Sequence, residues 1–270
     1  MTHPLDGVYI KLARAETHLQ AIREAVQPIV DAEADVILGE FDPKSKKYVF
    51  RAKRDAQPPD WISPVIGDCV HNMRAALDYI IWELVPESVR VGKYATHIEF
   101  PIFIDPSLYA SMAPKKIRGV PPGAETAIKC LQPFNGPNGR PDFRLAHPTD
   151  RPLARLFALD NWDKHRSLAL TQTAVSYYFE GLREIGIFAP RKADSHAFSG
   201  HLKRGAPILS LDGLGDRPEV NVYLHTAYDV AFDVGGPAFL QPVVRTLIEI
   251  REEILGRVLP ALAQFFPARP

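Results

Sequence analysis

The chain has 270 residues, of which 46% are hydrophobic and 24% are charged, and its 32 basic residues are balanced by 32 acidic ones. This composition is typical of a soluble globular protein and excludes an intrinsically disordered chain. The formal net charge of zero excludes a global attraction to nucleic acid or to an anionic membrane, although it leaves room for a local basic patch.

The first predicted elements are an amphipathic helix over residues 6–27, with Pro28 near its end, and then a β-hairpin over residues 36–53. Two β-prone runs flank a polar Asp-Pro turn in the hairpin. In the helix, apolar residues recur at intervals of three and four; they are Val8, Leu12, Ala15, Leu19, Ile22 and Val26.

A long helix is predicted over residues 66–84, with Ser63 as its N-cap and Pro64 at the first helical position. We expect the other helices to pack around it. One face is apolar, and an adjoining line on the same helix carries His71, Arg74 and Asp78 at helical spacing. The apolar face consists of Ile66, Val70, Met73, Leu77, Ile81 and Leu84.

Shorter elements are predicted in the middle of the chain. Residues 98–104 form an extended piece, residues 107–118 and 124–131 are short helices bounded by prolines, and residues 134–141 form a loop rich in Asn, Gly and Pro.

Another helix is predicted from Leu153 to about Thr173, and it carries a second cluster of charges. Helical geometry places Asp163 and Arg166 on or beside its apolar side, where charged groups need partners because an unpaired buried ion is too costly. The polar line of the long helix offers such partners. We therefore expect the two helices to face each other and the two clusters to form one network.

From residue 176 the pattern changes to alternation and short apolar runs, which predicts strands at residues 177–179, 184–189, 207–211 and 220–234. Residues 237–266 then predict a helix with a wide apolar stripe. The fold class predicted is α+β.

We expect one domain of residues 1–270. Residues 1–173 are mainly helical, with the hairpin 36–53, and residues 174–234 form an antiparallel sheet. The C-terminal helix, 237–266, returns to a bundle with the other long helices.

Two segments carry a resemblance to a known group of proteins. GDxxHNxRxALD at residues 67–78 and DKHR at residues 163–166 together resemble an uncharacterised bacterial family that has both motifs in this order. The resemblance covers about 20 residues and implies that both segments belong to one site, without implying an activity.

The chain is also loosely similar to HEPN domains, which are helical bundles of bacterial defence and toxin systems, many of them metal-independent RNases. Their mark is an arginine followed four to six residues later by a histidine. In this chain His71 precedes Arg74 by three residues, and the forward spacing occurs at Arg191–His196 and Arg140–His147, in segments predicted to be loop or strand.

The candidate catalytic residues are His71, Arg74 and Asp78. In a pocket, Arg74 or Arg166 can hold a phosphate or carboxylate by a bidentate contact, and His71 can act as a general base oriented by Asp78. The candidate ligand-binding residues are Asn72, Asp160, Asp163, Lys164 and Arg166.

Three functions stay open, and the sequence does not decide whether the protein is an enzyme. The first is binding of an anionic small molecule or a nucleic-acid phosphate at this site. The second is metal-independent RNA cleavage of the HEPN kind, with histidine moving the proton and arginine stabilising the phosphorane. The third is a non-enzymatic interaction protein, a homodimer through its apolar last helix, whose polar network is purely structural.

No cofactor and no metal are expected. The sequence contains no phosphate-binding P-loop, no GxGxxG turn and no GxSxG elbow. His71, Asp78, Asp160 and Asp163 could supply metal ligands, but the ligand sets typical of helical bundles are absent.

The cysteines and the N-terminal residues bear on localisation. Two cysteines, Cys69 and Cys130, are too few for a disulfide framework. The first residues lack the basic and apolar regions of a signal peptide, and no apolar run reaches the roughly 18 residues that span a bilayer. We therefore expect a cytoplasmic protein with no membrane partner.

Overall fold

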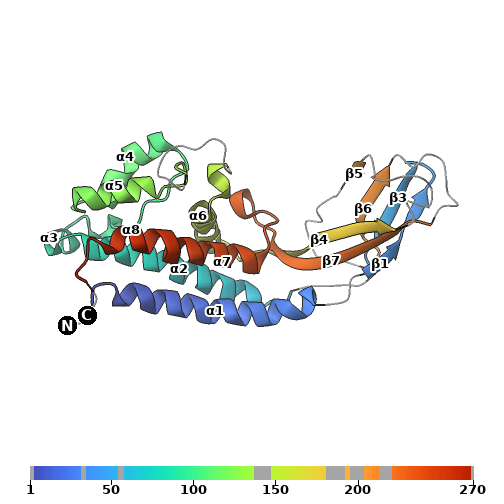
Figure 1. Ribbon diagram of the computed structural model, residues 1–270, viewed down its shortest axis with the longest axis horizontal. Helices are drawn as coiled ribbons and strands as arrows, with labels where there is room; N and C mark the ends of the chain where they lie inside the picture. The colour runs from blue at the N-terminus through green and yellow to red at the C-terminus, as the bar shows by residue number, and fades with distance from the viewer. Residues whose placement is uncertain are drawn as a thin grey trace.

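The computed structural model describes residues 3–31, 35–53, 58–136, 147–180, 192–194, 204–212 and 221–268. A helical body occupies one end of an elongated molecule, and small antiparallel sheets occupy the other (Figure 1). Strands β4 (Leu170–Glu180) and β7 (Tyr223–Phe232) run from the body into the β region. The predicted α+β class with a helical bundle is confirmed.

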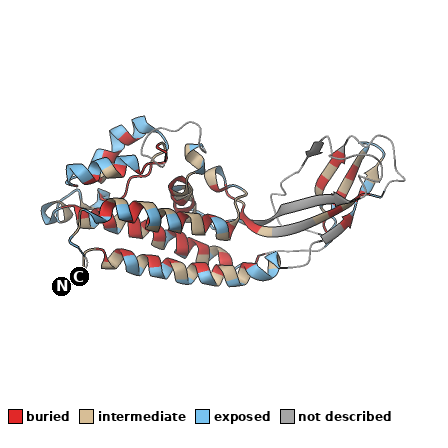
Figure 2. Ribbon diagram, viewed as in Figure 1, coloured by how far each residue is buried: buried red, intermediate tan, exposed pale blue. Residues whose placement is uncertain are grey.

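Helices α1 (Asp6–Val30) and α2 (Ile62–Leu84) pack side by side along the body. All six predicted apolar positions of α1 are buried, and their burial is the main force that holds this helix in place. Figure 2 shows the buried residues of α2 in the middle of the helical body, where the other long helices surround them.

The predicted start of α2 is wrong in one detail. Trp61 is the N-cap, and Ser63 already lies inside the helix. The Ser63 hydroxyl donates a hydrogen bond to the carbonyl of Leu168 (2.8 Å), so it fastens α2 to the chain that follows α6 (Pro152–Asp163) instead of capping its own helix.

The shorter helices cover one side of the body. They are α3 (Glu87–Arg90), α4 (Pro106–Lys116) and α5 (Pro122–Cys130). The predicted extended piece at 98–104 belongs to no described strand, and buried side chains satisfy its backbone. Gln132, for example, donates to the Pro101 carbonyl (2.9 Å) and accepts from the Phe103 amide (3.0 Å).

The second charged helix is shorter than predicted, because α6 ends at Asp163 and not near Thr173. The amides of His165 and Arg166 both donate to the Trp162 carbonyl, which closes the helix with a turn. From Leu170 the chain pairs with β7 as a strand, and these inter-strand hydrogen bonds replace the helical ones.

The C-terminal helix begins at α7 (Val243–Glu253), later than the predicted residue 237. It continues through a π-helical turn (η5, Ile254–Val258) into α8 (Leu259–Ala263). Pro260 lacks the amide that would continue the regular ladder, which accounts for the irregular turn before it. As predicted, the helix returns to the bundle, where it packs on α1, α2 and α6.

The described strands of the β region form two antiparallel sheets, with strand orders β1-β7-β4 and β2-β3-β6-β5. The predicted hairpin contributes to both, since Gly39 separates β1 from β2. A Cβ at Gly39 would lie 2.9 Å from the Phe50 ring, so glycine permits this close passage. The remaining strands are β1 (Asp35–Leu38), β2 (Glu40–Asp42), β3 (Lys47–Arg51), β5 (Lys192–Asp194) and β6 (Pro207–Asp212).

Each end of the molecule has its own apolar cluster. The larger one fills the helical body around α2, and the smaller one lies in the β region. The strand predicted at 184–189 falls outside the described residues, whereas those predicted at 207–211 and 220–234 correspond to β6 and β7. The smaller cluster consists of Ile37, Tyr48, Phe50, Leu209, Leu211, Val222 and Leu224.

Candidate functional site

Arg74 lies inside the helical body, with a side chain that is only 6% exposed. Its Nη2 lies 2.8 Å from Asp78 Oδ1, one helical turn along α2, and donates to the Phe100 carbonyl, also at 2.8 Å. Asp78 in turn accepts a hydrogen bond from the Phe100 amide (2.8 Å). The pair thus satisfies both backbone groups of Phe100 and fastens the extended segment to α2.

Glu99 and Lys116, both partly exposed, complete the group of charges around buried Arg74. Glu99 accepts from Arg74 (3.2 Å), and Lys116 forms an ion pair with the other oxygen of the same carboxylate. We call Arg74, Asp78, Glu99 and Lys116 the inner cluster. It connects α2, the extended segment and the end of α4. Every charge in it contacts an opposite charge.

The carboxylates of the inner cluster titrate differently. Burial raises the pKa of Asp78 to about 6, against the opposing effects of Arg74 and the Phe100 amide. Burial also raises the pKa of Glu99, but Lys116 and Arg74 outweigh it and hold that pKa below its ordinary value. Glu99 is therefore the firmly ionised partner of the two cations.

Asp78 also borders a surface groove of about 750 Å³ between the start of α1 and the second half of α2. Tyr79 and Trp82 line this groove, and the two residues are 44% and 36% exposed. Asp6 and Glu83 add carboxylates to its wall. The groove thus combines exposed aromatic surface with acidic groups.

A second group of charges lies where α2 meets α6. Asp160 is buried, with a side chain only 4% exposed. Its Oδ2 lies 2.6 Å from Lys164 Nζ, and its Oδ1 lies 3.8 Å from His71 Nδ1. His71 and Lys164 are more than half exposed, so this group opens to solvent. We call His71, Asp160, Asp163 and Lys164 the outer cluster.

Asp163 belongs to this cluster through its contact with Gly67 on α2. A Cβ built on Gly67 would lie only 2.4 Å from Asp163 Oδ1, so the carboxylate lies directly against the α2 backbone. Burial raises the pKa of Asp163, and the nearby negative charges of Asp160 and Asp68 raise it further. The structure thus gives a packing reason for the glycine of the GDxxHN motif.

The two clusters influence each other electrostatically. The charge of Asp160 contributes to the raised pKa of Asp78, and Lys164 helps to lower the pKa of Glu99. Among the described residues, however, His71 contacts Asp160 on α6 whereas Arg74 and Asp78 pair with Glu99 and Phe100, so the two clusters do not form the single network of direct contacts that we expected. Asp160, with its buried carboxylate, is the residue of α6 that ties them most directly.

Two candidates lie outside this arrangement. Arg166 is exposed and stacks on Trp162, with its Cζ 5.3 Å from the ring centroid. Its predicted position beside the apolar side of the helix is wrong, because α6 ends three residues earlier. Asn72 donates to the Asp68 carbonyl of its own helix (2.7 Å). His165 is exposed.

Glu99, Phe100 and Lys116 are site residues that the motifs did not indicate. Each reaches the inner cluster from an element distant in sequence from both motifs. One available signal was Glu99, an acidic residue placed between buried Ile98 and Phe100. Such a placement is costly without a buried partner such as Arg74.

Cys69 is a buried thiol in the core of the helical body. Burial raises the pKa of the Cys69 thiol to about 12, and the thiol donates to the Ala15 carbonyl (3.3 Å), so it is an inert packing group. Among the residues that the structure describes, no cluster of three or more His, Cys, Asp or Glu side chains is arranged to hold a metal ion.

Comparison of the chain with protein-family models, with curated proteins and with solved structures finds no match. In the described part of the chain, no helix has both the length and the apolar character required to cross a bilayer.

Proposed function

We propose that the protein is a non-enzymatic interaction protein in which the His/Arg/Asp network is structural. The observation that carries this proposal is the environment of Arg74. Its guanidinium is buried and engaged by Asp78, Glu99 and the Phe100 carbonyl. A guanidinium held in this way fixes the chain around it and is not presented to a substrate.

The alternatives receive less support from the same geometry. Anion binding needs a cation that is free to contact the anion, but Arg74, Lys116 and Lys164 each pair with a carboxylate. HEPN-like RNA cleavage needs histidine and arginine on the same phosphate. His71 faces solvent while Arg74 is buried. Both alternatives stay untested predictions.

One atom keeps anion binding in consideration. Arg74 Nη1 is buried and has no hydrogen-bond partner among the residues that the structure describes. A buried donor without an acceptor is costly, so an anion oxygen that reached it would gain a strong charge-assisted hydrogen bond.

The contact surface that we propose for a partner is the groove beside Asp78. It presents the rings of Tyr79 and Trp82 together with Ile10, which is 69% exposed. Exposed aromatic side chains beside polar groups are typical of protein interfaces. The burial of Leu247, Ile250 and Ile254 in the body favours the groove over the apolar stripe of the last helix as the contact surface.

The experiment compares the wild type with His71→Ala and Arg74→Lys in three assays: cleavage of a mixed-sequence RNA, binding of inorganic phosphate, and stability. We expect neither cleavage nor phosphate binding that depends on His71, and a loss of stability in Arg74→Lys. RNA cleavage that disappears in His71→Ala at unchanged stability would overturn the proposal.

Self-association tests the groove. Sedimentation equilibrium of the wild type, Trp82→Ala and Trp61→Ala separates groove contacts from general loss of aromatic surface, because Trp61 is also exposed but lies outside the groove. If the partner is a second copy, only Trp82→Ala weakens the dimer.

A cytoplasmic location and a bacterial origin belong to the same proposal. Cys69 and Cys130 are both free thiols, which supports a reducing compartment. The bacterial origin rests on the resemblance of the GDxxHNxRxALD and DKHR segments alone.

A further inference from the structure

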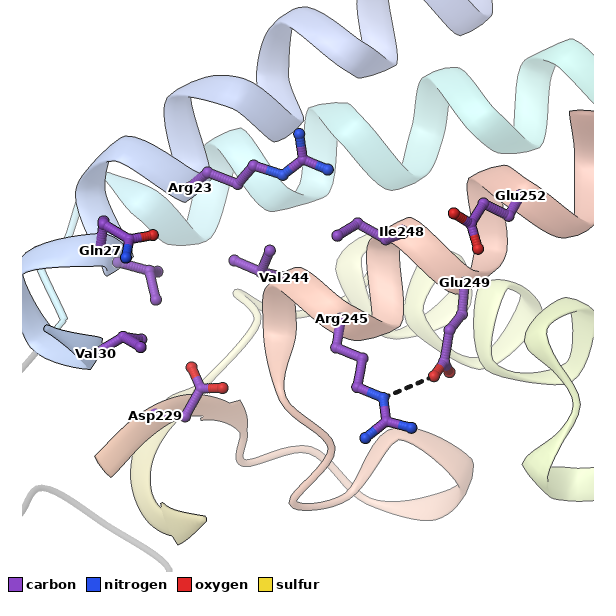
Figure 3. A pocket seen from close by; sticks show the side chains of 10 residues that line it. Arg23, Gln27, Val30, Asp229, Val244, Arg245, Ile248, Glu249 and Glu252 are labelled. Carbon is purple, nitrogen blue, oxygen red and sulfur yellow. Dashed lines mark hydrogen bonds and ion pairs between the residues drawn. The ribbon is translucent and has the colours of Figure 1, made fainter. Parts of the chain in front are cut away.

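A cavity separate from both clusters lies where β7 joins the helical body. It has a volume of about 420 Å³, opens to solvent, and is lined by α1, α7 and the end of β7 (Figure 3). Four aliphatic side chains from the two helices line it, Val26 and Val30 on α1 and Val244 and Ile248 on α7, together with Gln27 and five charged residues. Sites for small molecules combine apolar surface with polar groups that fix the orientation of the ligand.

Of the three carboxylates that line the cavity, Asp229 is the one that comes from the sheet. Asp229 on β7 is half-buried, and Figure 3 shows its side chain directed toward the gap between α1 and α7. It accepts a hydrogen bond from the Val230 amide (2.7 Å), and no described residue gives it a cationic partner. Burial raises the pKa of Asp229. A partly desolvated carboxylate gains free energy from any cation that reaches it.

The arginines that line the cavity are already engaged. Arg245 turns toward Glu249, with its Nε 2.9 Å from the carboxylate, and Arg155 lies 2.8 Å from the other oxygen of Glu249. Arg23 lies 3.5 Å from Glu16. Among the described residues, the lining charges without an ion-pair partner are therefore Asp229 and Glu252, and both are negative.

We propose that this cavity binds an aliphatic ammonium group, with the nitrogen on Asp229 and the hydrocarbon against the valine and isoleucine walls. An ammonium has three donors and a compact charge, so it can pair with Asp229 and leave the Val230 hydrogen bond in place. The hydrocarbon removes apolar wall surface from water. This proposal does not depend on the function of the two clusters.

The chemistry has two possible sources, a free amine and a lysine side chain of a partner protein. Both present the same ammonium on a flexible aliphatic stem. The experiment includes one probe for each source.

The first measurement titrates the whole protein with n-hexylamine, n-hexanol and hexanoate, which share a chain length and differ in charge. Binding is followed by NMR of the methyl groups of the four wall residues. We expect hexylamine to bind at least about tenfold more tightly than hexanol, because its ammonium adds an ion pair with Asp229. We expect hexanoate to bind most weakly, because Asp229 repels its carboxylate.

Two aspartate variants test the role assigned to Asp229. Asp229→Asn keeps the shape and should reduce the preference for amine over alcohol to about onefold. Asp233→Asn is the matched control, since Asp233 is another half-buried aspartate four residues along that does not line the cavity. It should retain the wild-type preference.

Further outcomes decide whether the cavity binds an ammonium group and which source supplies it. Equal binding of hexylamine and hexanol by the wild type, or shifts confined to residues outside the cavity, would overturn the proposal, and neither result requires a folded variant. A peptide with one central lysine identifies a partner protein as the source if it binds more tightly than hexylamine and its acetylated form does not bind. Tighter binding of the free amine identifies a small molecule, and either result supports the ammonium site.

Discussion

The two charged clusters share helix α2, but they differ in their access to water. In the inner cluster, Arg74 is almost completely buried and holds both backbone groups of Phe100 together with Asp78. In the outer cluster, His71 and Lys164 are exposed on either side of buried Asp160. His71 and Arg74 are three residues apart on α2. Within one helical turn, the helix thus carries one side chain that is accessible to solvent and one that is buried and holds the neighbouring chain in place.

The largest expected effect is that of Arg74→Ala. The substitution leaves Asp78 and Glu99 without their shared cation and the Phe100 carbonyl without its donor. We expect a loss of about 3–5 kcal/mol in the free energy of unfolding, the usual result of breaking a buried ion pair. Urea denaturation measures it.

The control for Arg74→Ala is Arg245→Ala. Arg245 makes the same kind of ion pair one turn along its helix, but its side chain is 78% exposed. This variant should lose no more than about 0.5 kcal/mol. Equal losses in the two variants would mean that burial does not distinguish the inner cluster.

The titration of Asp78 provides the next test. Its pKa is about 6 in the folded protein against 3.8 ordinarily, so the folded state binds this proton more tightly than the unfolded state. The stabilisation from this group is therefore complete below about pH 4 and is lost as the pH rises through about 6. Its size is about 3 kcal/mol at most.

Other carboxylates also titrate in this range, so the wild type is compared with Asp78→Asn. Urea midpoints from pH 4 to pH 7 should show a decrease with rising pH in the wild type that is weaker in the variant. Identical pH profiles would show that Asp78 does not carry the effect.

The contact between Gly67 and Asp163 is expected to have an intermediate effect. Replacing glycine by alanine within a helix normally adds about 1 kcal/mol of stability. At Gly67 the new methyl group would collide with the Asp163 carboxylate, so we expect a loss of about 1–3 kcal/mol instead. Gly256→Ala, where no atom lies within 4 Å of the added Cβ, is the matched control.

A double variant distinguishes this collision from a general defect of the helix. Truncation of Asp163 to Ala should remove most of the loss caused by Gly67→Ala, because the colliding group is then absent. Losses that simply add in the double variant would place the cause elsewhere.

The smallest expected effect is that of His71→Ala. The imidazole is 64% exposed, and its Nδ1 lies 3.8 Å from Asp160, so the pair is weak and solvated. We expect a change in the free energy of unfolding below about 0.5 kcal/mol at pH 7. A loss of several kcal/mol on urea denaturation would show that the outer cluster is as structural as the inner one.

The sequence predicted the helices more successfully than their ends. The apolar stripes of α1 and α2 determine burial directly, because side-chain spacing alone decides which face is apolar. The end of α6 at Asp163 was not predicted, since pairing of β4 with the distant strand β7 overrides the local helical pattern. Ser63 likewise finds its partner in Leu168, 105 residues away.

The candidate site was likewise predicted only in part. Helical spacing placed Arg74 and Asp78 next to each other, as the structure does. Helical spacing could not indicate that Phe100 and Glu99 would accept hydrogen bonds from the Arg74 guanidinium, because these two residues come from an irregular segment with no periodic pattern. The predicted position of Arg166 was wrong because the prediction assumed that the helix continues past its actual end at Asp163.

Amide hydrogen exchange at Phe100 tests the structural role of the inner cluster most directly. The amide donates to Asp78 Oδ1, and Arg74 holds the carbonyl of the same residue. We predict strong protection in the wild type, a loss of protection of at least about tenfold in both Asp78→Ala and Arg74→Ala, and no change in His71→Ala. A Phe100 amide that exchanges equally fast in all four proteins would contradict the account.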